Sequence, residues 1–100
     1  MIDSTRRIIE VILSIPKGKV SCYRDVAARA GIPNGARQVV RVLHSMSRTY
    51  NLCWHRIVKA DGFIALENSK GGTLQAELLL REGVEVSRDG RVDLAKFGWK

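Results

Sequence analysis

The stretch YRDVAARAGIPNGARQVVRVL, residues 23–43, indicates the fold of this chain. Its first half has apolar residues at helical spacing, namely Tyr23, Val26, Ala27 and Ala30. Ser21 offers an N-cap to this helix, Gly31 supplies a left-handed C-cap position, and residues 32–35 form a tight connection. The second half repeats the spacing at Ala36, Val39, Val40 and Leu43. Two short helices joined by such a turn are typical of a helix-turn-helix.

Two further amphipathic helices are predicted on either side of this stretch. Residues 4–15 form the first, which Asp3 or Ser4 can cap and which ends at Pro16. Its apolar cluster consists of Ile8, Ile9, Ile12, Leu13 and Ile15. Residues 73–82 form the second, which Gly83 ends. Its inward side chains are Leu74, Leu78 and Leu79.

Short β-prone runs complete the expected architecture. Residues 57–59 and 63–66 flank an Asp-Gly turn, which is a strong hairpin signal, and a hairpin that follows a helix-turn-helix is a wing. A last small hairpin or a paired extended tail is expected over residues 84–94. We therefore expect residues 1–100 to form one mainly α domain with a small β wing, that is, a winged helix-turn-helix.

The charge of the chain points to a polyanionic partner. Seventeen Lys and Arg against ten Asp and Glu give a net charge of +7. Nucleic acid is the first candidate and an anionic membrane surface the second. No run of about 18 apolar residues and no signal-peptide pattern is present, so we expect a cytoplasmic protein. The two cysteines, Cys22 and Cys53, are too few for a disulfide framework or a zinc site, and we expect both to be reduced and no metal to be bound.

One face of the third helix is basic. Its members lie at i, i+4, i+7 and i+11, and they are Arg37, Arg41, His44 and Arg48. A solvated face more often mixes the two signs of charge. The stripe therefore favours a helix laid against phosphates and bases over a merely soluble surface.

Residues 52–58, LCWHRIV, place a thiol, an indole, an imidazole and a guanidinium in an apolar setting. An extended chain over 53–58 would point Trp54 and Arg56 to one side and Cys53 and His55 to the other. Cys53 and His55 could form a nucleophile and base pair, although adjacent Cys and His are more often packing groups. Trp54 could be core, or a surface on which an unpaired base stacks.

These residues resemble a known family. Trp-His-Arg-Ile-Val at 54–58 is similar to the Pro-Cys-His-Arg-Val active-site motif of the DNA alkyltransferases that repair O6-alkylguanine, with Trp54 at the position of the nucleophilic cysteine. That replacement marks the alkyltransferase-like proteins. The spacing from Tyr23 to Arg37, with Gly-Ala-Arg-Gln-Val at 35–39, also matches the family, and the similarity runs to about Phe97.

The resemblance implies a role for individual residues. Tyr23 would help to rotate the phosphate of the target nucleotide, and Arg37 would enter the duplex from the minor groove to fill the gap left by a flipped base. Glu82 would support His55, as a carboxylate orients an imidazole. The implied lesion pocket consists of Tyr23, Trp54, His55, Arg56, Ile57, Ser69 and Glu82. The implied DNA-binding residues are Tyr23, Gly35, Ala36, Arg37, Gln38 and Arg41.

The chain also departs from the family. The family commonly has proline where this chain has Cys53, and glycine near Val40. The pocket asparagine and tyrosine of active transferases are not evident around Met46 and Ser69.

Alkyl transfer requires a thiolate, and an indole offers no comparable nucleophile. The resemblance therefore implies a monomeric protein without catalytic residues or a cofactor. Such a protein would bind O6-alkylguanine in double-stranded DNA, flip it without repairing it, and mark the site for nucleotide excision repair proteins.

Two alternatives remain open at this level. The main one is a sequence-specific transcriptional regulator that uses the basic stripe of the third helix in the major groove. The other is an active transferase that relies on Cys53.

Overall fold

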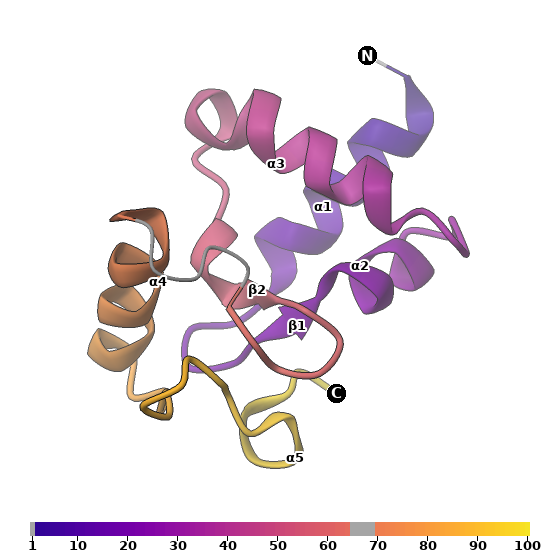
Figure 1. Ribbon diagram of the computed structural model, residues 1–100. Coiled ribbons are helices and arrows are strands. Elements are labelled where there is room, and N and C mark those ends of the chain that lie inside the picture. The colour runs from indigo at the N-terminus through magenta and orange to yellow at the C-terminus, as the bar shows by residue number, and fades with distance from the viewer. Residues whose placement is uncertain (1, 65–69) are drawn as a thin grey trace.

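The computed structural model describes residues 2–64 and 70–100, and Figure 1 shows how their elements are arranged. Ser69 and the far end of the predicted wing, residues 65–66, lie outside the described residues. The described elements are α1 Asp3–Ser14, β1 Ser21–Cys22, α2 Tyr23–Arg29, α3 Ala36–Tyr50, the 3-10 helix η1 Trp54–Arg56, β2 Ile57–Val58, α4 Lys70–Arg81 and α5 Leu94–Phe97. No helix within the described ranges is both long enough and apolar enough to cross a membrane.

The predicted first helix is confirmed as α1, and its inward face is formed by Thr5, Ile8, Ile9 and Ile12. Two details of the prediction are wrong. No side chain caps its start, because Asp3 is already helical and its carboxylate pairs with the arginines that follow it. Leu13 is exposed rather than inward, since the face of α1 that packs on the core is formed by Ile8, Ile9 and Ile12.

The predicted helix-turn-helix is confirmed as α2 and α3. Gly31 adopts a positive φ of 77° after α2, and Gly35 precedes α3. The backbone N–H of Ile32 donates to the carbonyl of Ala27 at 2.9 Å, and that of Gly35 donates to the carbonyl of Ile32 at 2.9 Å, which closes the turn. Ser21 does not cap α2, because it belongs to β1 instead.

The small sheet is parallel, which the sequence analysis did not predict. Ser21 pairs with Ile57 and Cys22 with Val58. The Asp-Gly turn after β2 is present, since the N–H of Lys59 donates to the carbonyl of Phe63 at 2.9 Å. Phe63 itself bridges to Arg91 in antiparallel fashion instead of continuing a hairpin with β2. The C-terminal segment was expected to be a hairpin or a paired tail, and it is paired with the turn after β2.

The core has two parts, one on each side of β2. Ile57 belongs to a cluster with the inward residues of α1, α2 and α3, whereas Val58 belongs to a cluster with α4 and the C-terminal segment. Adjacent residues of a strand point to opposite faces, so two consecutive buried residues join both clusters. Figure 1 shows the resulting arrangement, with α1, α2 and α3 together and α4 on the other side of the sheet.

The predicted fourth helix is confirmed as α4, and it begins before Thr73. Leu79 is fully buried as expected, but Leu74 is 45% exposed. Gln75 takes the buried position instead, at 2% exposure, because it has backbone partners described below.

Candidate nucleic-acid interface

The turn before α3 depends on the absence of a side chain at Gly35. A Cβ atom there would lie 2.6 Å from Cγ2 and 2.8 Å from the carbonyl oxygen of Ile32. The φ of Gly35 is −93°, so its backbone conformation is open to any residue and the need for glycine is steric. The close approach to Ile32 sets where α3 begins, and therefore where the next residues, Ala36 and Arg37, leave the turn.

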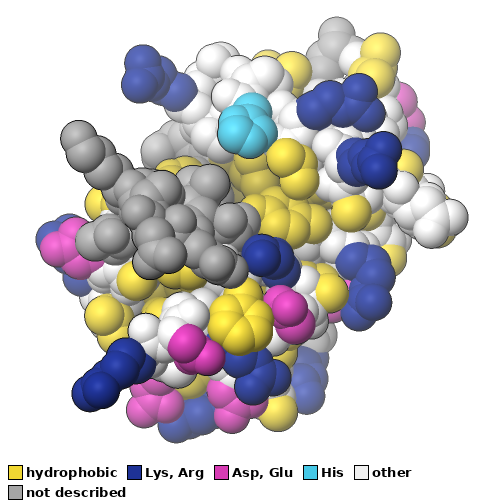
Figure 2. Space-filling model, viewed as in Figure 1, with side chains coloured by type: hydrophobic (Ala, Val, Ile, Leu, Met, Phe, Trp, Pro, Cys, Tyr) yellow, Lys and Arg dark blue, Asp and Glu magenta, His cyan; other side chains and the backbone are white. Residues whose placement is uncertain are grey.

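The basic stripe of α3 is exposed. Its members Arg37, Arg41, His44 and Arg48 all lie on the surface. None of these four side chains forms a hydrogen bond or an ion pair with another described residue. Figure 2 shows dark-blue Lys and Arg side chains and a cyan His over the region of α3. Arginine side chains without a partner among the described residues are available to phosphate groups.

Two other predicted DNA-binding residues have partners inside the protein. The amide nitrogen of Gln38 donates to the hydroxyl of Ser4 at 2.8 Å, which ties α3 to α1. Tyr23 opens α2, is half-buried and packs against the first core cluster. Burial raises the pKa of its phenol, so the hydroxyl stays protonated and can donate a hydrogen bond.

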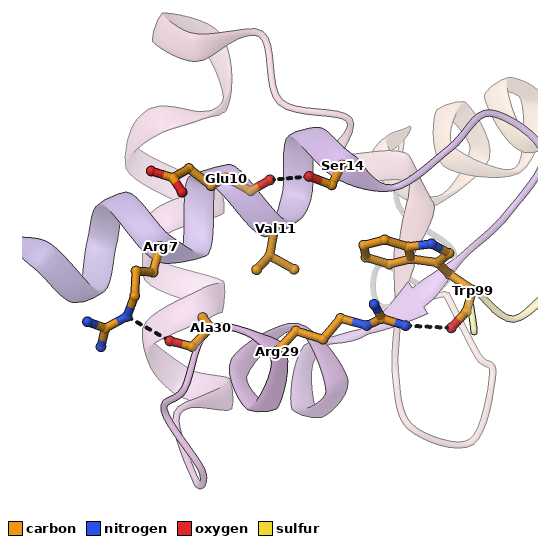
Figure 3. A pocket seen from close by; sticks show the side chains of 7 residues that line it. All are labelled: Arg7, Glu10, Val11, Ser14, Arg29, Ala30 and Trp99. Atoms are coloured by element: carbon orange, nitrogen blue, oxygen red, sulfur yellow. Dashed lines mark hydrogen bonds between the residues drawn. The ribbon is translucent and has the colours of Figure 1, made fainter.

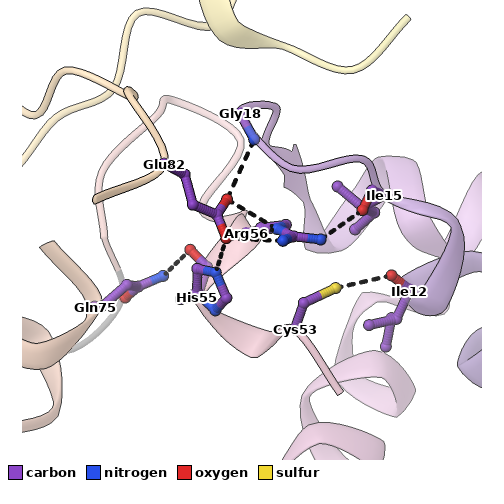
Figure 4. Close-up of polar contacts among 8 residues, drawn as sticks. All are labelled: Ile12, Ile15, Gly18, Cys53, His55, Arg56, Gln75 and Glu82. Atoms are coloured by element: carbon purple, nitrogen blue, oxygen red, sulfur yellow. Dashed lines mark hydrogen bonds and ion pairs between the residues drawn. The ribbon is translucent and has the colours of Figure 1, made fainter. Parts of the chain in front are cut away.

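Residues 54–56 form a 3-10 helix, so the predicted extended conformation is wrong there. The side chains therefore do not alternate. His55 and Arg56 both reach Glu82, whereas Cys53 turns toward α1, where its thiol donates to the carbonyl of Ile12 at 3.0 Å (Figure 4). Cys53 and His55 thus use different partners and form no nucleophile and base pair.

Glu82, just after α4, is the centre of the polar cluster in Figure 4. Its carboxylate accepts hydrogen bonds from Nε2 of His55 at 2.7 Å, from Nη2 of Arg56 at 2.7 Å and from the N–H of Gly18 at 3.2 Å. The remaining Nη1 of Arg56 donates to the carbonyl of Ile15 at 2.8 Å. The predicted contact between Glu82 and His55 is present. The sequence analysis missed the part of Arg56, which joins Glu82 to the end of α1.

The electrostatics of this cluster hold Glu82 ionised. Burial alone would raise the pKa of its carboxyl, but the hydrogen bonds from Arg56, His55 and Gly18 outweigh it and lower the pKa from 4.5 to about 2. The same contact with Glu82 raises the pKa of Arg56. The side chains of His55, Arg56 and Glu82 are only 14%, 17% and 10% exposed, so little water screens them.

Gln75 of α4 is a second polar link that the sequence analysis missed. Its amide nitrogen donates to the carbonyls of His55 at 3.2 Å and of Ile57 at 2.9 Å. A single polar residue on the apolar face of a predicted helix is a signal that could have identified it. The partners of Gln75, however, are backbone groups of a distant segment, which no local pattern reveals.

Trp54 is the member of η1 whose side chain has no polar link among the described residues. It is half-buried, and its indole lies edge-on to the ring of His55, with the centroids 6.2 Å apart and the planes at 86°. Of the other predicted pocket residues, Ile57 is fully buried in the first core cluster. The pocket itself stays a prediction, as does the role of each residue assigned to it.

A separate hollow of about 440 Å³ lies between α1, the end of α2 and the C-terminal tail (Figure 3). Arg29 stacks on the indole of Trp99, with its guanidinium carbon 3.7 Å from the ring centroid, and Arg7 donates to the carbonyl of Ala30 at 2.8 Å. The contact of Arg29 with Trp99 fixes the tail against α2, and the bond from Arg7 joins α1 to the end of α2. No group of three or more His, Cys, Asp or Glu side chains within the described residues is placed to hold a metal ion.

Comparison with known proteins places the chain in a family. The family model described as "6-O-methylguanine DNA methyltransferase, DNA binding domain" matches residues 3–84. The DNA base-flipping protein of Escherichia coli K12 is 42% identical over 96 residues, which cover 94% of this chain and 72% of that protein. Alkyltransferase-like protein 1 of Schizosaccharomyces pombe is 30% identical over 99 residues, covering 94% of this chain and 92% of that protein.

Comparison with solved structures leads to the same family as comparison with these two relatives. The crystal structure of S. pombe Atl1 in complex with damaged DNA containing O6-carboxymethylguanine superimposes with a TM-score of 0.88 at 30% identity, over 100% of this chain and 97% of that one. The chain therefore belongs to the family of the 6-O-methylguanine DNA methyltransferase DNA-binding domain, and within it to the alkyltransferase-like proteins. The predicted fold class and the predicted family are both confirmed.

Proposed function

We propose that this protein binds O6-alkylguanine in duplex DNA and flips the damaged nucleotide into a pocket walled by Trp54, without transferring the alkyl group. Trp54 carries the proposal, because the resemblance of residues 54–58 to the family's motif assigns it the position of the nucleophilic cysteine. It opens a turn whose next two side chains are fixed by Glu82. The frame of an alkyltransferase site is kept while its reactive group is replaced.

The exposed face of α3 supports a DNA partner. Arg37 lies in the first turn of α3, directly after the packed turn at Gly35, with no protein partner among the described side chains. A planar cation on a rigid helix end can fill the gap that a flipped nucleotide leaves in the stack. Tyr23, at the start of α2, would contact the phosphate of that nucleotide through its protonated hydroxyl.

The absence of alkyl transfer follows from the chemistry of residues 53 and 54. An indole has no lone pair comparable to a thiolate, so Trp54 cannot displace guanine from an alkyl carbon. The neighbouring thiol, that of Cys53, donates a hydrogen bond to the carbonyl of Ile12. Burial raises its pKa, so little thiolate is present near neutral pH.

The relatives support the same reading. One of them is named for base flipping, and Atl1 has been solved with DNA that contains O6-carboxymethylguanine. A protein that holds a lesion without repairing it needs a later step. We therefore propose that the complex marks the site for nucleotide excision repair proteins, and that the protein acts as a cytoplasmic, nucleoid-associated monomer.

A gel-shift comparison tests the lesion binding. Two duplexes of one sequence, with guanine or O6-methylguanine at one position, are titrated at the same stated salt concentration. We expect clearly tighter binding to the modified duplex, because phosphate contacts alone would be equal on both. Equal affinity would contradict the proposal, and a preference for one undamaged sequence over the lesion would favour the transcriptional regulator.

The repair step needs a separate experiment. Incision by purified nucleotide excision nuclease at O6-alkylguanine would be measured with and without the protein. Stimulated incision at the lesion, and not at a matched undamaged site, is expected. Unchanged incision would contradict the proposed role in nucleotide excision repair and would not affect the proposed lesion binding.

A further inference from the structure

We propose that Gln75 is a positioning residue for the lesion pocket: its buried amide fixes the 3-10 turn that carries Trp54. This inference rests on the proposed lesion binding and adds to it a residue of α4 that does not face DNA. Gln75 is 2% exposed, and its amide nitrogen bridges the carbonyls of His55 and Ile57.

The chemistry of the two partners fixes the orientation of the Gln75 amide. Both are carbonyl oxygens, so only the NH₂ end of the amide can face them. A carboxylate in the same place would set oxygen against oxygen. The site therefore requires a donor at the end of a side chain of this length, and the two bonds span the junction between η1 and β2.

Gln75 and Glu82 act from neighbouring parts of one segment. Gln75 lies in α4 and Glu82 directly follows the last residue of that helix, with the fully buried Leu79 between them. Glu82 holds the side chains of His55 and Arg56, whereas Gln75 holds the backbone on either side of Arg56. Together they fasten η1 by both its side chains and its main chain (Figure 4).

The position of the Trp54 side chain depends on these hydrogen bonds more than the positions of His55 and Arg56 do. A three-residue 3-10 helix has little stability of its own. The indole has no hydrogen bond to another described residue, and it lies edge-on to the ring of His55, whose carbonyl accepts from Gln75. Small displacements of a positioning turn can change recognition strongly, because a site works only near one geometry.

The first test uses the free protein labelled with ¹⁵N, in which the Trp54 indole N–H signal is identified by W54F. Gln75→Met keeps the length of the side chain and removes the donor, and we expect it to shift or broaden the Trp54 signal. Gln75→Asn keeps the amide donor on a shorter side chain and should change the Trp54 signal less. This variant also tests the proposal if the Met variant does not fold. Leu79→Val, a buried neighbour on α4, should lower stability and leave the Trp54 signal in place.

The second test measures the affinity ratio between the O6-methylguanine duplex and the guanine duplex, well below each variant's unfolding midpoint. We expect Gln75→Met to reduce this ratio roughly tenfold, with unchanged affinity for the guanine duplex, because the phosphate-facing stripe of α3 is untouched. Leu79→Val should keep the wild-type ratio. An unchanged Trp54 signal, or an unchanged ratio, in Gln75→Met would overturn the positioning role. A wild-type protein without any lesion preference would instead refute the proposed function, and the Trp54 signal would still decide whether Gln75 orders the turn.

Discussion

Glu82 shows how one side chain can serve both the stability and the site of a small protein. Its carboxylate accepts from His55, Arg56 and Gly18, and through Arg56 it reaches the end of α1. The cluster is largely shielded from solvent, so removal of one partner would leave the others uncompensated. The carboxylate that contacts His55 therefore also ties α1, η1 and the end of α4 together.

The lowered pKa of Glu82 predicts how stability changes with pH. Its contribution is complete above the unfolded-state value of 4.5 and is lost as the pH falls toward the folded-state value of about 2. That shift corresponds to roughly 3 kcal/mol. Urea unfolding between pH 6 and 2 should show this loss in the wild type and a flatter profile in Glu82→Gln. The exposed Glu77→Gln serves as control, and a Glu82→Gln profile as steep as the wild type would contradict the assignment.

Arg37 is predicted to matter for DNA rather than for stability. Arg37→Ala should weaken binding to the O6-methylguanine duplex by about 1 to 3 kcal/mol, through loss of the plug and of a phosphate contact. A fluorescent base opposite or beside the lesion should report less flipping. Arg88→Ala removes the same charge from an exposed position outside α3 and should have a smaller effect. If the two changes weaken binding equally, Arg37 contributes only its charge, and its role as a plug is contradicted.

At the level of elements, the turn between α2 and α3 sets the position of α3, the helix that we propose to face DNA. Gly35→Ala would bring a methyl group against Ile32, and overpacking of this kind typically costs about 1 to 3 kcal/mol. We expect a lower unfolding midpoint and weaker binding to both duplexes, since α3 must shift as a unit. Thr49→Ala, at an exposed position late in α3, should be close to neutral. Wild-type stability in Gly35→Ala would show that the turn relaxes without moving α3.

The elements with strong periodicity were predictable, and those defined by distant partners were not. α1, α2, α3 and α4 follow from apolar spacing in the sequence, and Pro16, Gly31 and Gly83 mark the ends of α1, α2 and α4. η1 was mistaken for part of a strand, because it directly precedes the β-prone Ile57 and Val58, whereas its 3-10 turn is held by Glu82 and Gln75 from far along the chain. The parallel pairing of β1 with β2 likewise has no local signature.

The candidate site was predictable to a similar degree. The family's motif pointed to Trp54, to Arg37 and to the pairing of Glu82 with His55, and that pairing is present. The roles of Arg56 and Gln75 were missed, since a buried hydrogen bond to backbone depends on the tertiary fold. Strand alternation placed Cys53 on the same side as His55, which is wrong, because residues 54–56 form a 3-10 helix and the thiol of Cys53 donates to the carbonyl of Ile12 instead.

For the whole molecule, the net charge of +7 should govern affinity without governing lesion choice. O6-methylation adds no charge to guanine, so the two duplexes offer the same phosphates. We expect log affinity to fall with log salt at the same slope for both duplexes, by about 0.9 per phosphate contacted. The ratio of affinities should then stay constant across salt concentrations. If the preference for the lesion disappears at higher salt, it arises from electrostatics and not from the pocket.

The central claim is that the molecule recognises the lesion and leaves it unchanged. The most direct measurement is to incubate the protein with a duplex whose O6-methylguanine carries an isotopically labelled methyl group, isolate the complex, and locate the label. We predict that the label stays in the DNA of the complex and that the intact mass of the protein does not change. A labelled methyl group on the protein, at Cys53 or elsewhere, would contradict this account.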